Sequence, residues 1–317
     1  MKSRRVNVNI FSRVSVKNIL AGQEKQTNSF LSEGVRAMLL STFFFALMNV
    51  FIKLVPDIPA MEIVFFRCLV SMTICFVGIR RAGADWRGSS RLLLFLRGAF
   101  GTTALYLFFI TLQNVPLASS VTISYLSPIF TAALAIFLLK EKVYAAQWIF
   151  FAISISGVFV MKGFDQRIPP VFLATGIASG FFSALAYNMV RSLKGREHPL
   201  VVVLHFQLVG VAVGFLVTLF DFRLPNLAET ILLFGVGLAT HFGQVYLTRA
   251  LQSEKIAKVS ILNYVGIIYA LAFGWLIFGE TYSLQTALGI LLVTAGVAAS
   301  ILYSRRKAEM IDENTVG

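Results

Sequence analysis

The chain has 317 residues, of which 57% are hydrophobic and only 14% are charged. Soluble domains carry about 25% charged residues, so this composition excludes an ordinary soluble protein and indicates an integral membrane protein. The formal net charge of +13 would suit nucleic acid only if the basic residues lay on one folded face, and they are instead spread over short segments between apolar runs.

In chain order, a polar and basic segment is followed by ten apolar runs and a short polar end. The first segment, residues 1–33, contains no long apolar stretch, so we expect a cytoplasmic tail rather than a secretory signal. Because irregular backbone cannot face lipid, each run of about 20 residues predicts a membrane-spanning helix. The predicted spans are residues 34–54, 59–79, 92–113, 117–139, 146–162, 169–191, 199–220, 227–250, 256–278 and 283–303.

Two long segments of the chain match each other in register. Residues 93–158 lie without a gap over residues 232–297, which start 139 positions later, so that Tyr125 matches Tyr264 and Glu141 matches Glu280. The first helices of the two halves align at an offset of 138. We therefore predict two five-helix repeats, 34–163 and 169–304, with a cytoplasmic tail at 305–317. A duplicated bundle places a substrate site between its halves, which is the plan of a transporter.

The basic residues predict the orientation of the spans. With a cytoplasmic N-terminus, 22 of the 28 Lys and Arg residues fall in inner segments and only four in outer ones, as the positive-inside rule requires. Five spans per half then insert the two halves in opposite directions, with the Lys140–Lys142 turn inside and its counterpart, Gly279–Tyr282, outside. The predicted fold is an all-α integral membrane protein with ten transmembrane helices, arranged as two inverted five-helix repeats around a central cavity.

A family resemblance begins within the fourth span. The segments Ser127–Thr131 and Leu139–Lys142, then Gln147-Trp148 and Gly157, resemble the recurring signature of the EamA family in the drug/metabolite transporter superfamily. The second half, from Asn263-Tyr264 through Gly279-Glu280 to Gly289 and Gly296, is a looser version that lacks the proline and the tryptophan. Phe65-Phe66-Arg67 and Leu96-Arg97-Gly98 also resemble the branch that includes bacterial S-adenosylmethionine carriers.

This resemblance implies a ten-helix carrier in a bacterial inner (plasma) membrane, with both termini in the cytoplasm. It also implies a central cavity lined mainly by the first, third, fourth, sixth, eighth and ninth helices.

Arg67 is the leading candidate for substrate binding. It falls near mid-depth in the second span, where an arginine costs several kcal/mol unless it is paired. The repeat offset places His205 opposite it, and two such groups near the midplane suit a carboxylate. The alternative is a structural arginine that caps carbonyls or pairs with another helix. Arg97 lies close to the end of its span and is expected to extend to the membrane surface.

Polar stripes on the fourth and eighth spans predict further cavity residues. Ser120, Ser124, Ser127 and Thr131 share one helical face, and so do Gly237, His241, Gln244 and Thr248. Each stripe lines a cavity or serves close packing and hydrogen bonding between helices. The complete set of predicted substrate-binding residues is Arg67, Tyr125, Ser124, His205, His241, Gln244, Asn263, Tyr264, Asn49 and Asn188.

Titratable residues in the spans are few, which limits the coupling mechanisms. Glu62, His205 and His241 are the candidates for proton coupling, with coupling-free exchange as the alternative. The three histidines lack a ligand spacing, so no metal site is expected. Cys68 and Cys75 are seven residues apart on one predicted helix, beyond disulfide reach, and should be free thiols.

The function that these features predict is secondary transport of a small polar metabolite by alternating access. A carboxylate-bearing substrate is expected, such as an amino acid, an amino-acid derivative or an S-adenosylmethionine-like compound. No cofactor and no enzymatic activity are expected, and the partners are the substrate and membrane lipid, with the chain a monomer or a homodimer. A non-transporting scaffold or receptor stays open. A membrane-embedded transferase is a weaker alternative, because no Asp-x-x-Asp cluster is present for magnesium diphosphate.

Overall fold

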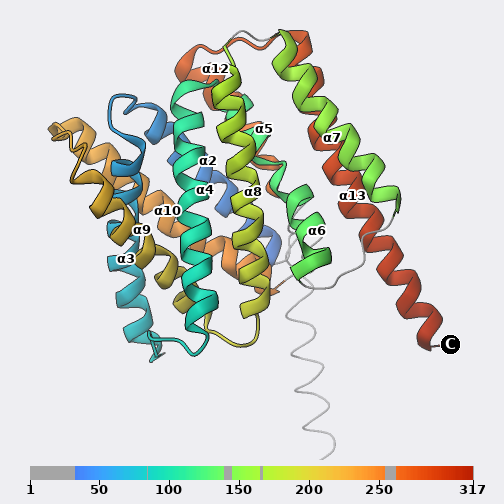
Figure 1. Ribbon diagram of the computed structural model, residues 1–317, viewed down its shortest axis with the longest axis horizontal. Helices are drawn as coiled ribbons and strands as arrows, with labels where there is room; N and C mark the ends of the chain where they lie inside the picture. Colours follow the sequence, from blue (N-terminus) through green and yellow to red (C-terminus); the bar gives the residue numbers. More distant parts are fainter. Residues whose placement is uncertain (1–32, 84, 139–144, 165–166, 254–261, 317) are drawn as a thin grey trace, which may run out of the picture.

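The computed structural model describes residues 33–83, 85–138, 145–164, 167–253 and 262–316. Over these residues the secondary structure is helical, without a strand (Figure 1). The helices are α2 (Glu33–Lys53), α3 (Ala60–Ala82), α4 (Arg91–Asn114), α5 (Leu117–Ser124), α6 (Ser127–Leu138), α7 (Ala145–Phe164), α8 (Pro170–Leu193), α9 (Pro199–Thr218), α10 (Leu227–Ser253), α12 (Val265–Phe278) and α13 (Leu284–Val316).

Eight segments are long and apolar enough to cross a membrane, and they coincide with eight of the predicted spans. They are Gly34–Lys53, Ala60–Arg81, Arg91–Asn114, Leu117–Leu138, Pro170–Leu193, Pro199–Thr218, Leu227–Leu247 and Leu284–Tyr303. Two shorter apolar helices, Ala145–Met161 and Val265–Phe278, fall in the remaining predicted spans. The prediction of an all-helical membrane protein is confirmed. Ten spans and an inverted repeat stay predictions, since residues 256–261 of the ninth predicted span lie outside the described residues.

Two elements differ from the sequence-based expectation. The fourth span is predicted as one helix, but it consists of α5 and α6, which are separated at Tyr125 and Leu126. The tenth helix continues beyond the predicted end of its span, since α13 runs to Val316. This extension includes Arg305-Arg306-Lys307-Ala308-Glu309, a run of strong helix formers, so the helix has no reason to stop at the membrane edge.

The bundle is built from paired helices. α2 packs along α10, α4 along α8, α3 along α9, and α7 along α13. The α7–α13 crossing is close, because a Cβ on Gly157 would lie 2.7 Å from the backbone nitrogen of Val293 and 2.8 Å from the carbonyl oxygen of Gly289. Gly157 and Gly289 therefore bring two backbones into contact, as small residues do in membrane helices.

The largest apolar cluster lies toward the end of the bundle that is uppermost in Figure 1, where α2 ends and α5 begins. Ile52, Ile58, Ile63, Phe109 and Leu117 are each 1% exposed or less. We call this the upper end, and the opposite end, where α4 begins and α8 ends, the lower end. Cys68 and Cys75 are buried free thiols, as predicted.

Candidate functional site

Two helix breaks meet inside the bundle, and a tyrosine marks each of them. Tyr125 follows the last residue of α5, and Tyr264 precedes the first residue of α12. Their ring centroids are 5.1 Å apart with the planes at 68°, and the Tyr125 hydroxyl donates to the Asn263 carbonyl oxygen at 2.8 Å. These two tyrosines are the partners that the internal repeat matches. Broken helices in corresponding positions of two halves are typical of transporter substrate sites.

The first break has a local cause in Pro128. A proline has no N–H for the carbonyl four residues earlier, here that of Ser124, and its ring clashes with that carbonyl. The chain tightens at this point, since the Leu126 amide donates to the Ile123 carbonyl oxygen at 3.1 Å and the Ile129 amide to the Leu126 carbonyl oxygen at 3.0 Å. The break thus forms a tight turn, and this turn directs Tyr125 toward Asn263 and Tyr264 in the second half of the chain.

Gly266 makes room for this contact on the other side. A Cβ at this position would collide with the Tyr125 hydroxyl and would lie 4.0 Å from Cβ of Thr42 in α2. The hydroxyl end of Tyr125 therefore lies against Gly266 of α12, and any larger residue at position 266 would displace it.

Arg67 is buried at the centre of a contact between α3, α9 and α10. Its side chain is 1% exposed, and its Nε donates to Oγ1 of Thr240 at 2.8 Å. Its guanidinium carbon lies 5.5 Å from the ring centre of Phe206 and 6.0 Å from that of Phe109. Nη1 is buried without a hydrogen-bond partner. No carboxylate of the described residues lies within ion-pair distance of it.

Arg97 does not extend to the membrane surface, so the sequence-based expectation is wrong. It is 8% exposed, and its guanidinium carbon lies 4.3 Å from the ring centre of Phe206. Gly101, one turn further along α4, leaves the space that the guanidinium occupies, since a Cβ there would collide with Nη1 of Arg97. The aromatic ring on α9 and the missing side chain at Gly101 together hold the charge inside the bundle.

His205, which the repeat offset matches with Arg67, makes a contact within its own helix. Its Nδ1 lies 2.9 Å from the Val201 carbonyl oxygen, one turn back along α9. Its neighbour on α9, Phe206, lies against Arg67.

Several other predicted site residues have a buried polar atom without a hydrogen-bond partner. Such atoms are rare in folded proteins and call for an explanation, such as a ligand or ordered water. Within the described residues they include Asn49 Oδ1, Asn188 Oδ1, His241 Nδ1 and the Tyr264 hydroxyl, besides Nη1 of Arg67 and Nε of Arg97. These atoms are available to a polar substrate.

In the hydroxyl stripe of the fourth span, side chains donate hydrogen bonds to carbonyl oxygens of their own helix. The Ser124 hydroxyl donates to the Val121 carbonyl oxygen at 2.7 Å, and that of Thr131 to the Ser127 carbonyl oxygen at 2.7 Å. Asn188 bridges to this segment, since its Nδ2 donates to the Thr131 carbonyl oxygen at 3.2 Å. Gln244 is half-buried on α10, and the side chain of Thr248 lies outside the described residues.

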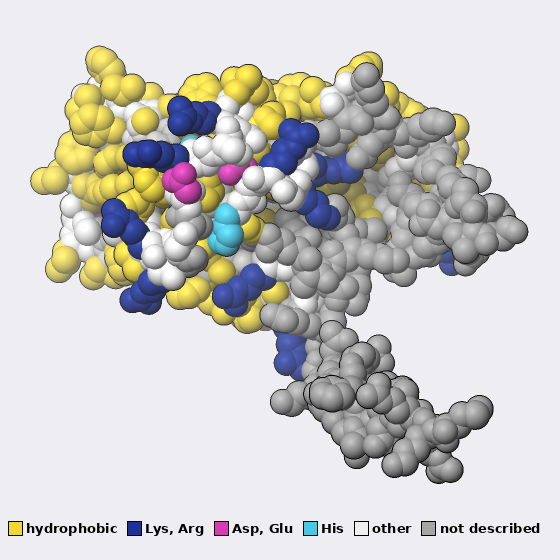
Figure 2. Space-filling model, turned by 90° about the horizontal axis from the view of Figure 1, so that it is seen from below, with side chains coloured by type: hydrophobic (Ala, Val, Ile, Leu, Met, Phe, Trp, Pro, Cys, Tyr) yellow, Lys and Arg dark blue, Asp and Glu magenta, His cyan; other side chains and the backbone are white. Residues whose placement is uncertain are grey.

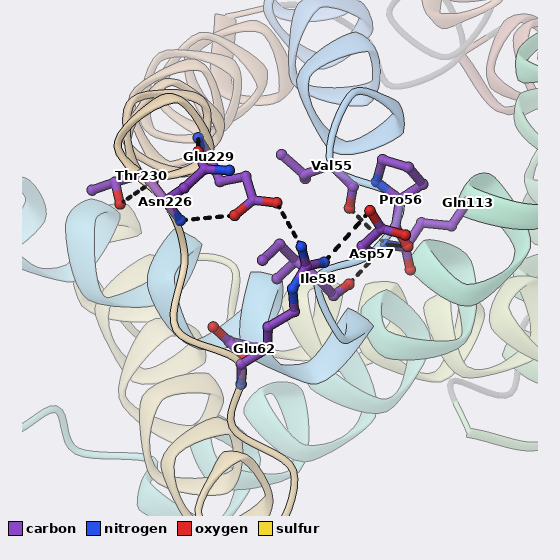
Figure 3. A network of polar contacts seen from close by, with 10 residues as sticks. Val55, Pro56, Asp57, Ile58, Glu62, Gln113, Asn226, Glu229 and Thr230 are labelled. Carbon is purple, nitrogen blue, oxygen red and sulfur yellow. Dashed lines mark hydrogen bonds and ion pairs between the residues drawn. The ribbon is translucent and has the colours of Figure 1, made fainter.

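Glu62 lies at the upper end, within the polar network of Figure 3. It is fully buried, its Oε2 accepts from the Arg223 amide at 3.1 Å, and its Oε1 has no partner. A pocket of about 230 Å³ opens beside it, lined in part by Tyr106, Gln113 and Asp221. Glu62 is thus a buried carboxylate at the upper end of the bundle, beside this pocket. Over the described residues, no group of three His, Cys, Asp or Glu side chains could hold a metal ion.

A second carboxylate, Glu280, joins three elements at the upper end. It pairs with Lys53 at 2.8 Å and accepts from the Leu117 amide, the first residue of α5, at 2.9 Å. The Tyr282 hydroxyl donates to it at 2.9 Å, and burial together with the carboxylate raises the pKa of Tyr282. Lys53 also donates to the Val115 carbonyl oxygen at 2.8 Å. The repeat partner, Glu141 in the Lys140–Lys142 turn, lies outside the described residues.

Comparison with known proteins agrees with this architecture. The model of the EamA-like transporter family matches residues 32–162 and 171–302. The chain is similar to the pseudopaline exporter CntI of Pseudomonas aeruginosa, with 31% identity over 85% of this chain and 96% of the relative. It is also similar to human solute carrier family 35 member G1, with 29% identity over 84% of this chain and 79% of the relative.

A solved structure shares the fold. One crystal structure superposes with a TM-score of 0.59 at 16% identity, over 86% of this chain and 96% of that one. The relatives are membrane transporters, so this protein is an integral membrane transporter and not an enzyme, which removes the transferase alternative. The predicted resemblance is confirmed, and the chain belongs to the EamA-like transporter family.

Proposed function

We propose that this protein is a secondary transporter that moves a small polar, carboxylate-bearing metabolite by alternating access. The observation that carries the proposal is the buried Arg67, which has an unpartnered nitrogen and, among the described residues, no carboxylate within ion-pair distance. An uncompensated guanidinium at mid-depth is costly, and in membrane proteins such charges mark substrate pathways. A carboxylate is the anion that matches its planar fork of donors.

The tyrosine pair and Arg67 belong to one site through α2. Thr240, which accepts a hydrogen bond from Arg67, donates to Sδ of Met48 at 3.0 Å. Gly266, which lies against the Tyr125 hydroxyl, also faces Thr42. Met48 and Thr42 are six residues apart on α2, or about 9 Å along the helix axis. A metabolite of ordinary size can span this distance, with its carboxylate at Arg67 and its body against Tyr125 and Tyr264.

The helix pairing supports an inverted repeat. The repeat matches α2 with α8 and α4 with α10, and the observed α2–α10 and α4–α8 pairs exchange under that operation. α3–α9 and α7–α13 each map onto themselves. Such pairing allows the two halves to rock against each other around a fixed central site.

The membrane orientation is proposed from the charges at the lower end. Figure 2, which looks at this end, shows Lys and Arg side chains gathered on it. Arg80 and Arg81 lie in the last turn of α3, and Arg191 lies in the last turn of α8. Lys194 and Arg196 follow in the turn after α8. We therefore place the lower end and both termini in the cytoplasm of a bacterial inner membrane. The protein is proposed to work as a monomer or a homodimer.

Coupling is proposed to use protons through Glu62, His205 or His241, with coupling-free exchange as the second possibility. Glu62 is buried at the upper mouth with an unpartnered oxygen, and His241 has a buried, unpartnered Nδ1. Both are therefore groups that can take up a proton during the cycle. Flux into proteoliposomes with and without a pH gradient is the test, in the wild type and in Glu62→Gln and His241→Ala. Flux that no gradient or variant alters removes the proton mechanism.

The transport proposal itself is tested by counterflow. Solutes that raise the thermal stability of the purified protein are loaded into proteoliposomes, and uptake of the labelled solute is followed. Carboxylate-bearing solutes should exchange, and liposomes without protein should not take them up. A protein that binds such a solute and never moves it would be a receptor or scaffold.

A further inference from the structure

Two buried arginines from neighbouring helices contact one aromatic ring. Arg67 comes from α3 and Arg97 from α4, and Phe206 of α9 lies 5.5 Å from the first guanidinium carbon and 4.3 Å from the second. Since both distances end at the same ring centre, the two guanidinium carbons are less than about 10 Å apart. The side chains are 1% and 8% exposed, so neither charge is solvated at the surface.

Both charges lack a compensating anion among the described residues. The ion pairs there involve Lys53 and Arg223, not these two arginines. Arg67 keeps Nη1 unpartnered, and Arg97 keeps Nε unpartnered. A ring contact stabilises a desolvated cation by less than the cost of burying an unpaired ion, and two like charges this close add repulsion. Packing therefore does not account for the pair.

We infer that the transported metabolite carries two carboxylates, one bound by Arg67 and the other by Arg97. The inference rests on the proposed transport function and extends it to a substrate class, dianionic organic acids. Each guanidinium offers a planar fork that one carboxylate fills bidentately. A separation below about 10 Å fits two carboxylates joined by a few carbon atoms. Phe206, which both guanidinium groups contact, provides apolar surface against which that carbon chain packs.

The single-carboxylate alternative makes a different prediction. If one carboxylate bridged both arginines, replacing a second acid group by an amide would leave the affinity unchanged. If each arginine binds its own carboxylate, the same replacement removes a charge-assisted contact, which corresponds to about ten- to a hundred-fold in affinity. The amide has nearly the same size and shape, so the comparison isolates the charge.

The experiment measures binding of succinate, glutarate and adipate, and of the monoamide of each, to the purified full-length protein. At least one diacid should bind about ten- to a hundred-fold more tightly than its monoamide. In Arg97→Gln the diacid should fall to the affinity of the monoamide. Arg80→Gln is the matched control, because Arg80 is an exposed arginine of α3 that also covers an aromatic ring, Phe76, at 4.9 Å. This control should keep the full difference.

A second variant, which keeps the positive charge at position 97, allows the test to proceed if Arg97→Gln does not fold. If Arg97→Gln does not elute as a folded particle, Arg97→Lys replaces it, and the loss of the planar fork should still narrow the gap between diacid and monoamide. Equal binding of diacid and monoamide by the wild type overturns the inference, and so does the absence of binding by all three diacids. Counterflow separates the two levels of the argument. Exchange of a solute with a single carboxylate leaves the proposed function intact and removes only the two-carboxylate substrate, whereas exchange of neutral solutes alone removes both.

Discussion

At the scale of single residues, the orientation of Arg67 is set before any substrate arrives. Thr240 accepts from Nε and in turn donates to the sulfur of Met48, so one edge of the guanidinium is fixed while Nη1 stays unpartnered. A group held in this way binds an anion without losing much rotamer freedom, which improves affinity.

Replacing the guanidinium of Arg67 by an ammonium group keeps the charge, so it should separate an effect on substrate binding from an effect on folding. Arg67→Lys should insert into the membrane and elute as the wild type does, but bind the transported carboxylate about ten- to a hundred-fold more weakly, because an ammonium cannot donate bidentately. The measurement is the dissociation constant of the purified protein for its stabilising solute. Arg80→Lys on the same helix is the control. Unchanged affinity in Arg67→Lys would show that this arginine is structural.

The two arginines show what can be predicted at this scale. A charge in the middle of an apolar run is visible in the sequence, so the sequence alone identifies Arg67 as a candidate binding residue. Arg97 stands near the start of its helix, where surface extension is the usual outcome. Its inward course depends on Phe206, more than a hundred residues away, and on Gly101 beneath it. Contacts of this kind follow from packing and not from local pattern.

At the scale of the elements, the helix breaks are only half predictable. Pro128 is the local signal for the break between α5 and α6, because its ring and its missing N–H disrupt the preceding helical turn. The position before α12 has no proline, and only the repeat, which matches Tyr264 with Tyr125, points to it.

Glu280 stabilises the upper end by capping α5 and by compensating Lys53. Glu280→Gln removes the negative charge and leaves Lys53, whose side chain is 16% exposed, with the Val115 carbonyl oxygen and the ring of Phe278. We expect a loss of about 1–3 kcal/mol in the free energy of unfolding. Thermal or denaturant unfolding in detergent checks it. Asp57→Asn, which removes an exposed ion pair at the same end, should change little; equal effects of both changes would refute the buried role.

Glu197 makes the α3–α4 connection sensitive to acid. Its Oε1 accepts from the Ser89 amide at 2.7 Å, the Ser89 hydroxyl at 2.6 Å and the Ser90 amide. Burial alone would raise its pKa, but these hydrogen bonds together hold the pKa of Glu197 below its usual value. A depressed pKa means that the carboxylate stabilises the fold above about pH 4.3 and that this contribution is lost as the pH falls through the lower, folded-state pKa.

The corresponding variant is Glu197→Gln. It should be less stable than the wild type at neutral pH, and the two unfolding curves should converge in acid, since the wild-type side chain is then neutral as well. Unfolding midpoints measured at a series of pH values show this convergence. A difference that stays constant over the series would mean that ionisation of Glu197 does not matter.

At the scale of the whole molecule, the spans were the most predictable feature. Eight predicted spans agree with observed helices, because runs of about 20 apolar residues bounded by Pro, Gly and charged turns leave few alternatives. Which helices pair could not be predicted from hydropathy, since lipid-facing and protein-facing sides are both apolar. The α7–α13 contact, for example, depends on Gly157 and Gly289, which belong to the family signature, but the sequence does not show which helix each glycine contacts.

The orientation of the bundle in the membrane is tested by labelling single cysteines from outside the cell. Thr281→Cys lies in an exposed loop at the upper end, and Arg196→Cys in an exposed turn at the lower end. The native Cys68 and Cys75 are buried, so an impermeant thiol reagent should give little background. If the positive-inside distribution sets the orientation, Thr281→Cys should react in intact cells and Arg196→Cys only after permeabilisation.

Both positions lie in the second half, after its first and its fourth predicted span, so the pair reports the topology of that half. An inverted repeat of five spans needs the loop after the ninth span outside while the turn after the sixth is inside. Labelling of Arg196→Cys in intact cells, with Thr281→Cys protected, would reverse the orientation of the whole bundle. Labelling of both from the same side would mean that the number of spans between them is even rather than odd. The second half would then lack the three crossings that a five-span repeat requires between these positions, and alternating access around the Tyr125–Tyr264 contact would need a different topology.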